Sequence, residues 1–214
     1  YMNWNQILPE FNNNLPEIIF EDSDISNKFI IFNFINDSKK LEFPIDWNNK
    51  SWSRLWQFNL HYFDWAIEAL DTYLDEDYSS LNLILIGEIM DDWIDQNQPG
   101  RGDGWHSYTI SLRIRNWVWI FNSLPELATN KRLISLWRQI CWLNTHPENA
   151  NGGNHWLENL ISLVICSLQF KGSKARIIFR NSIYLLEKEL YLQILPDGGH
   201  EERSASYHLL ILER

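Results

Sequence analysis

From residue 53 onward, the sequence is a succession of segments whose apolar residues recur at the three- and four-residue spacing of helices. Short breaks rich in Gly, Pro and Asn separate these segments, as at Gln98-Pro99-Gly100 and Asn151-Gly152-Gly153. The pattern predicts helices at about residues 55–75, 80–96, 107–123, 130–144, 155–170, 173–192 and 201–214. Because the connections are short, we expect consecutive helices to be antiparallel neighbours.

Two of the predicted helices differ in how their apolar residues are distributed. Residues 155–170 are apolar nearly all round, whereas residues 174–192 mix charged and apolar positions. The first helix should be enclosed and the second should face outward. Alternating enclosed and outer helices are typical of a layered α/α toroid of antiparallel helix hairpins, and an ordinary helical bundle gives a similar pattern. Both interpretations are all-α.

The first fifty residues are Asn-rich and weakly periodic. Within them, residues 28–35 are predicted to form a strand, Asn36-Asp37-Ser38 a turn, and residues 40–43 a possible return strand before Pro44. We therefore divide the chain into a lead-in with a possible β-hairpin over residues 1–50 and a helical domain over residues 51–214.

Composition excludes several classes of protein. With 45% apolar and 21% charged residues, the chain is too apolar to be disordered, and no apolar run reaches the roughly 18 residues of a membrane span. The net charge of -10 argues against a nucleic-acid partner. Residues 1–100 hold 18 acidic and 5 basic residues, but residues 101–214 hold 10 and 13, so the second half tolerates an acidic ligand.

The cysteines and the chain ends do not decide the cellular compartment of the protein. Cys141 and Cys166 lie in apolar helical surroundings without a CxxC pattern and are interpreted as buried thiols. A disulfide bond between them remains an alternative. The start of the chain lacks a secretory signal. The chain begins at Tyr1 and ends inside a predicted helix, so we expect both ends to be cut from a longer protein.

Three stretches carry polar residues that packing does not require. In residues 195–208, helical spacing brings His200, Arg203, Ser204 and Tyr207 to one face, which is either a solvated face or a catalytic one. The second stretch is Asn151–Trp156, at the start of the enclosed helix.

In that second stretch, Asn154 is a natural helix N-cap and His155 could be a core histidine. Both residues could also bind a carboxylate, because a helix N-terminus gathers unpaired N–H donors and partial positive charge. Trp156 follows directly and could stack on a sugar ring.

The third stretch runs from Arg101 to Trp117. Arg113 either holds an anionic group or pairs with an acidic residue of the protein. Trp105 and Tyr108 adjoin the polar residues here and are candidates for contact with a ligand. The Gly-rich segment at residues 101–104 lacks the length and the Lys-Ser/Thr of a phosphate-binding loop.

Several ordered motifs resemble one known family. They are Asp46-Trp47, the run LWQFNLHYFD at residues 55–64, Ser111-Leu112-Arg113 with Asn116-Trp117, Gly153-Asn154-His155, and DGGHEERS at residues 197–204 with Tyr207-His208. Together they closely resemble the N-terminal helical domain of heparinase II/III-like polysaccharide lyases. The resemblance implies an incomplete α/α toroid, normally followed by a β-sandwich domain that this chain lacks, and it favours a periplasmic or secreted location.

The resemblance also implies a reaction, which is β-elimination across the glycosidic bond at C4 of a uronic acid. It makes Asn154, helped by His155, the residue that offsets the charge of the uronate carboxylate, and it makes Tyr207 the catalytic tyrosine. A tyrosine base needs a cation nearby to favour its anion, and Arg203 is placed one helical turn away. Arg203, His200, Arg113, Trp105, Trp156 and Tyr108 are the expected substrate-binding residues.

The implied partners are an acidic polysaccharide, heparan sulfate-like or alginate-like, and the β-sandwich domain of the same protein. No cofactor and no metal are expected, since the histidines lack HExxH-like spacing. Two alternatives stay open. One is an α/α-toroid glycoside hydrolase with Asp197 and Glu201 or Glu202 as its carboxylate pair, and the other is a non-catalytic glycan-binding domain.

Overall fold

The computed structural model describes residues 17–19, 29–67, 69, 81–148, 153–199 and 201 of the chain. Three short strands come first, and helices make up the rest. The strands are β1 (Glu17–Ile19), β2 (Phe29–Phe34) and β3 (Asp37–Glu42). The helices are α1 (Arg54–Tyr62), α3 (Leu81–Gln96), α4 (Ser107–Ser123), α5 (Asn130–Thr145), α6 (Gly153–Ser167) and α7 (Ser173–Gln193), with short 3-10 turns at Asp103–Trp105 and Pro125–Leu127.

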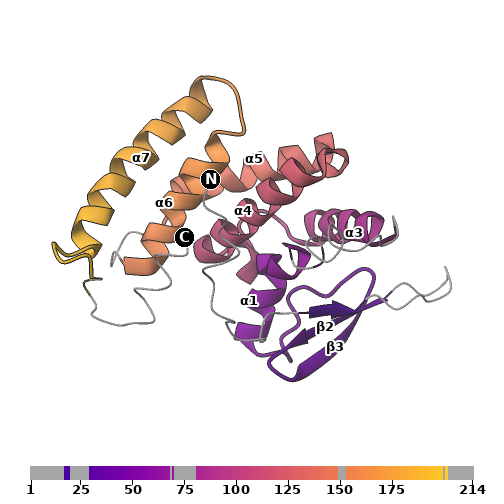
Figure 1. Ribbon diagram of the computed structural model, residues 1–214. Helices are drawn as coiled ribbons and strands as arrows, with labels where there is room; N and C mark the ends of the chain where they lie inside the picture. Colours follow the sequence, from indigo (N-terminus) through magenta and orange to yellow (C-terminus); the bar gives the residue numbers. More distant parts are fainter. Residues whose placement is uncertain are drawn as a thin grey trace.

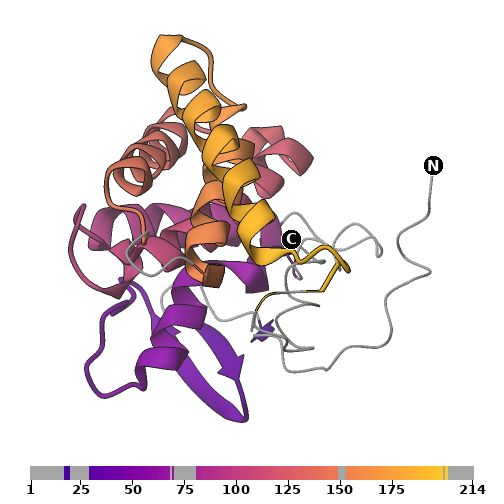
Figure 2. The ribbon, with the colours of Figure 1, turned by 90° about the vertical axis from the view of Figure 1, so that its left-hand side faces the viewer.

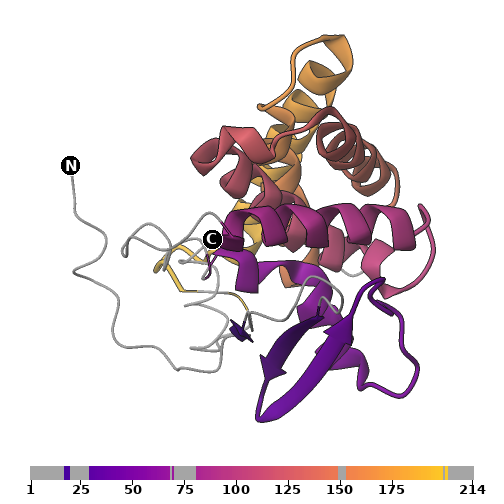
Figure 3. The same ribbon diagram turned by 90° about the vertical axis from the view of Figure 1, so that its right-hand side faces the viewer.

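The helices form an inner and an outer layer, and α4 is the central helix of the inner layer. Helix α4 packs against α1, α5 and α6, while α3 packs against α5 and α7 packs against α6 (Figure 1). Helix α7 lies on the outside of α6 (Figure 2), and α3 lies on the opposite side of the molecule, above the β-hairpin (Figure 3). An inner row of α1, α4 and α6 is thus flanked by α3, α5 and α7. The predicted all-α class is confirmed.

Burial follows the predicted alternation of enclosed and outer helices. Helix α6 buries eight residues, among them Leu157, Leu160 and Leu163, although Leu168 just beyond its end is exposed. Helix α7 is longer but buries only four, and it exposes apolar side chains such as Tyr191. None of the helices in the described ranges is both long and apolar enough to cross a bilayer.

The β-hairpin forms where it is predicted, but its turn is shifted by one residue. Phe34 pairs with Asp37, so the loop contains only Ile35 and Asn36, both at positive φ. Positive φ at both positions gives the two-residue turn that matches the twist of a hairpin. Asp37 and Ser38, predicted as turn residues, therefore belong to β3, and β1 adds a third antiparallel strand that the sequence did not indicate.

The hairpin and the helices share one hydrophobic core. The ring of Phe32 packs edge-on against Trp56 of α1 at 4.8 Å, and the Trp56 indole N–H donates to the Asp37 carbonyl. Trp47 donates its indole N–H to Asp92 of α3 at 2.8 Å. Packing is therefore continuous across the predicted boundary at residue 50.

The predicted helix at residues 55–75 is interrupted at Phe63: α1 ends at Tyr62, and the backbone is helical again at residues 64–67 and 69. Helix α1 begins after Ser53, whose hydroxyl accepts the Trp56 amide, and it ends at Tyr62 because Phe63 adopts a left-handed conformation with φ of 66°. The change of direction inserts the fully buried Phe63 ring between Trp65 and Trp117. Residues 68 and 70–75 of this predicted helix, and nearly all of the predicted helix 201–214, lie outside the described residues.

Candidate functional site

The first turn of α6 carries two of the residues predicted to be catalytic. Helix α6 begins at Gly153, so Asn154 is a residue of the first turn and the predicted N-cap role is wrong. Asn154 is half-buried, and its Oδ1 atom is buried without a hydrogen-bond partner in the part of the chain that the structure describes. A buried amide oxygen rarely stays unpaired, so this side chain is a candidate for contact with a ligand.

His155 is held in a defined orientation beside Asn154. Its ring stacks on Tyr108 of α4 with centroids 4.2 Å apart, and its Nδ1 lies 3.2 Å from Oε1 of Glu148. A proton on Nδ1 would make this contact a hydrogen bond and leave Nε2 as an acceptor, as in other carboxylate-oriented histidines. The side chain is 55% exposed, so it is accessible to a ligand.

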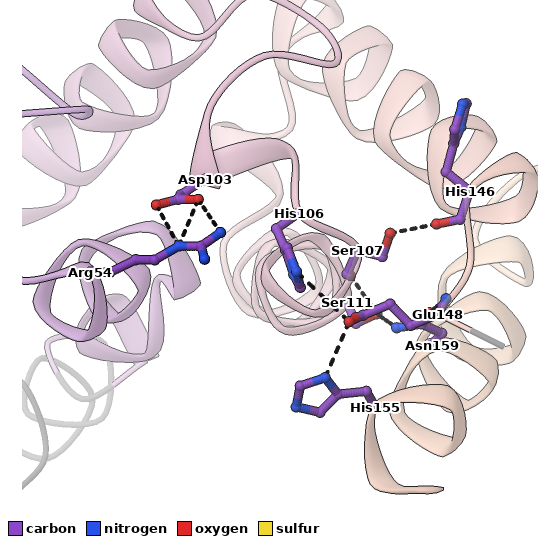
Figure 4. Close-up of polar contacts among 9 residues, drawn as sticks. All are labelled: Arg54, Asp103, His106, Ser107, Ser111, His146, Glu148, His155 and Asn159. Atoms are coloured by element: carbon purple, nitrogen blue, oxygen red, sulfur yellow. Dashed lines mark hydrogen bonds and ion pairs between the residues drawn. The ribbon is translucent and has the colours of Figure 1, made fainter. Parts of the chain in front are cut away.

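Glu148 joins the two histidines of the site (Figure 4). Besides its contact with His155, its Oε1 lies 3.7 Å from Nε2 of His106. The backbone of Glu148 is held in place, because its N–H donates to the side-chain oxygen of Asn159 at 2.8 Å. The Asn159 amide in turn donates to Ser111 Oγ at 2.9 Å, which fixes residue 148 against α4 and α6.

An aromatic surface extends from His155 toward α1. Tyr108 packs edge-on against Tyr62 at 6.0 Å, and Phe58 contacts both Tyr62 and His106. Burial raises the pKa of Tyr62, and Tyr108, Asp64 and Glu148 raise it further. Tyr62 therefore stays protonated at neutral pH and can donate a hydrogen bond, but it is poorly suited to act as a base.

Arg113, a predicted substrate-binding residue, lies in the core. Its side chain is fully buried over the ring of Trp93, and it donates to Gln139 Oε1 at 2.7 Å, to the Gly104 carbonyl at 2.7 Å and to the His61 carbonyl at 3.2 Å. These acceptors occupy the guanidinium, so the structure contradicts a direct contact with substrate. Arg113 is instead a positioning residue that holds the segment before α4 against α1.

Replacing Arg113 by methionine should destabilise the protein severely. The change leaves three buried acceptors without their donor, and each such loss costs about 1–3 kcal/mol. We expect the free energy of unfolding in urea to fall by at least about 3 kcal/mol, against less than about 0.5 kcal/mol for Arg180→Met on the exposed face of α7. Equal effects of the two substitutions would contradict the positioning role.

His61, under the same site, should make stability depend on pH. The ring is fully buried and its Nδ1 accepts the indole N–H of Trp93 at 3.0 Å. Burial, helped by the charge of Arg113, lowers the pKa of His61 to about 3 from the usual value near 6.5. Because the unfolded chain takes up this proton first, the contribution is complete above pH 6.5 and is lost as the pH falls from 6.5 toward 3.

The corresponding measurement compares the wild type with His61→Gln in urea at several pH values. The stability advantage of the wild type should shrink by about 1.4 kcal/mol for each pH unit below 6.5. An advantage that stays constant between pH 7 and pH 5 would show that His61 does not titrate in this way.

The remaining predicted residues are placed as follows. Trp105 is 6% exposed, donates to the Asn97 carbonyl and packs on Trp93, so at this site it is a core residue and does not offer its face to a sugar. Trp156 is half-buried on α6. His200, Arg203 and Tyr207 lie outside the described residues.

The structure gives no support to the carboxylate pair that the glycoside hydrolase alternative requires. Asp197 is exposed, and its Oδ1 accepts the Gly199 amide at 3.0 Å within a turn, while Glu201 is exposed and Glu202 lies outside the described residues.

Among the described side chains, no three His, Cys, Asp or Glu residues are grouped closely enough to hold a metal ion. Cys141 and Cys166 are both free thiols, the second fully buried.

Comparison with known proteins gives consistent matches. Residues 11–214 match the family described as Heparinase II/III N-terminus. The chain is 26% identical over 212 residues to a heparin-sulfate lyase of Bacteroides thetaiotaomicron, covering 88% of this chain and 29% of that protein. A solved structure of a heparinase III with methylated lysines superposes with a TM-score of 0.65 and 17% identity, over 80% of this chain and 30% of the other.

The chain therefore belongs to the heparinase II/III family of polysaccharide lyases and corresponds to its N-terminal part. The structural likeness shows that the two helical layers share the fold of part of that heparinase III. Both the predicted family and the predicted incomplete toroid are confirmed. The chain spans less than a third of the length of these two relatives.

Proposed function

We propose that the protein cleaves a uronic acid-containing acidic glycan by β-elimination, and that the surface around Asn154 and His155 receives the uronate carboxylate. The observation that carries the proposal is the position of the Asn154 side chain, whose amide N–H groups can donate to a carboxylate, in the first turn of α6 beside a histidine oriented by Glu148. Both residues lie in the first turn of α6, where free backbone N–H groups add partial positive charge.

The reaction requires a proton to leave C5 beside a negatively charged carboxylate. A base removes that proton, the electron pair forms the C4–C5 double bond, and O4 leaves with a proton from an acid. The carboxylate makes the first step difficult unless fixed donors offset the negative charge that develops on it. The side-chain amide of Asn154 is suited to this role, with the His155 ring beside it, and Tyr207 is the proposed base.

The acidic side chains nearby are already engaged, which makes the surface compatible with an anionic ligand. Glu148 is shared between His106 and His155, and Asp64 accepts the side-chain amide of Asn116 at 2.8 Å. Both carboxylates therefore lie beside a possible donor, although Oε2 of Glu148 is buried without a hydrogen-bond partner among the described residues. The half-buried rings of Tyr108 and Tyr62 supply flat faces for a sugar next to these groups.

The test is a screen of the complete protein against uronate polysaccharides, namely heparan sulfate, alginate and polygalacturonate. Elimination creates a conjugated double bond, so we expect one polymer to give products with new ultraviolet absorbance. New reducing ends without that absorbance would indicate hydrolysis and would contradict the proposal. Binding without either product would indicate the glycan-binding alternative.

A further inference from the structure

A groove lies between α5 and the start of α7, apart from the Asn154 surface. Its volume is about 590 Å³, within the range of small-molecule sites. The rings of Trp137 and Trp142 line it together with the cationic side chains of Arg138 and Lys174 and the amide of Asn144. No carboxylate occurs among its described lining residues.

The aromatic rings of the groove are fixed by the core behind them. Trp142 packs edge-on against the buried Trp105 at 5.6 Å and stacks on His146 at 3.8 Å. Trp137 packs on Phe170 at 5.0 Å. Both tryptophans are nevertheless half-exposed, so rigid aromatic surface remains open to the groove at little cost in side-chain entropy.

The cations of the groove are available to a ligand. Arg138 and Lys174 are exposed, and within the described ranges neither forms an ion pair with a carboxylate. Lys174 Nζ lies 5.8 Å from the centre of the Trp137 ring, so charge and aromatic face are presented together. Flat apolar rings beside cations that have no carboxylate partner among the described residues complement a sugar ring that carries a carboxylate or a sulfate.

We propose that the α5–α7 groove is a second binding site for an anionic sugar unit of the polymer, distinct from the surface where the bond is broken. The acidic class of the glycan rests on the proposed function, whereas the groove itself rests on its own lining. A site of this kind would hold the polymer while the reacting unit is exchanged, and it would contribute to affinity for long chains without taking part in the chemistry.

The test is calorimetric binding of heparan sulfate and alginate tetrasaccharides to the complete protein carrying Tyr207→Phe, so that the proposed reaction does not consume them, with maltotetraose as the neutral probe. We expect two sites for an anionic tetrasaccharide and weaker binding of maltotetraose. Arg138→Ala combined with Lys174→Ala should weaken binding at one site by about tenfold or more. In the protein that retains Tyr207, the same double variant should leave kcat for that tetrasaccharide unchanged.

A matched pair of substitutions controls for overall charge. Arg180→Ala combined with Lys188→Ala removes an exposed arginine and a lysine that lies over Tyr184, both on α7 and outside the groove. Trp137→Ala provides an independent test of the aromatic contact. The inference fails if the groove double variant keeps wild-type stoichiometry and affinity, if the control pair weakens binding equally, or if maltotetraose binds as well as the anionic probes.

This experiment separates the inference from the proposed function. Two-site binding of an anionic tetrasaccharide, together with no elimination activity of the protein that retains Tyr207, would support the groove and contradict the lyase proposal. Elimination by a protein that binds the tetrasaccharide at one site only, with no effect of the groove substitutions, would support the lyase proposal and contradict the groove.

Discussion

Replacing Asn154 by alanine is expected to lower kcat for elimination by about 10²- to 10³-fold, with a much smaller change in KM. The side chain is proposed to stabilise charge that develops on the uronate carboxylate only as the C5 proton leaves. An interaction made mainly in the transition state affects the rate of the chemical step more than substrate binding. The rate of formation of ultraviolet-absorbing product under saturating substrate measures this effect.

A matched control for this substitution is Asn130→Ala. Asn130 is an exposed asparagine at the first residue of α5, so its replacement makes the same chemical change in the first turn of another helix, away from the proposed site. We expect wild-type kcat for this control. A wild-type rate for Asn154→Ala, or a defect confined to KM, would contradict the role given to Asn154.

Replacing Tyr207 by phenylalanine should abolish the unsaturated product almost completely. The substitution removes only the phenolic oxygen, and general acid-base groups typically contribute about 10²- to 10⁴-fold to a rate. Because the ring is kept, we expect the circular dichroism spectrum and the thermal unfolding of the protein to be unchanged. Substrate binding should also persist, which allows the variant to be used for complexes with intact glycan.

Tyr191→Phe provides the control for this substitution. Tyr191 is 87% exposed on α7, so loss of its hydroxyl should leave turnover unchanged. If Tyr207→Phe retains wild-type turnover, another group must remove the C5 proton. If no polymer is cleaved even by the wild type, although glycans bind to both proteins equally, the non-catalytic alternative is favoured instead.

Helices and hairpin were predictable because their sequence signals are local. The bounds of α3, α4 and α5 agree with the predicted segments to within a residue, since periodic apolar spacing and turn residues mark both ends. The break at Phe63, between α1 and the helical residues 64–67, was missed, because Phe63 leaves the helix to bury its ring, a tertiary effect that the local helical pattern does not show.

The candidate site was only partly predictable. Asn154 and His155 stand out as polar residues at the start of an apolar helix, whereas Glu148 has no local signal because its role depends on how residues 146–148 lie against two helix ends. The burial of Arg113 could have been recognised. It lies four residues from both Thr109 and Trp117, on the face of α4 that points into the core.

The most direct test of the account is a crystal structure of the complete Tyr207→Phe protein with a bound uronate oligosaccharide. We predict that the uronate carboxylate lies within about 3 Å of the Asn154 side-chain amide and next to His155. The C5 hydrogen should face the ring of residue 207. A carboxylate bound elsewhere, with Asn154 contacting only protein atoms, would contradict the central claim that this face of α6 recognises the reacting uronate.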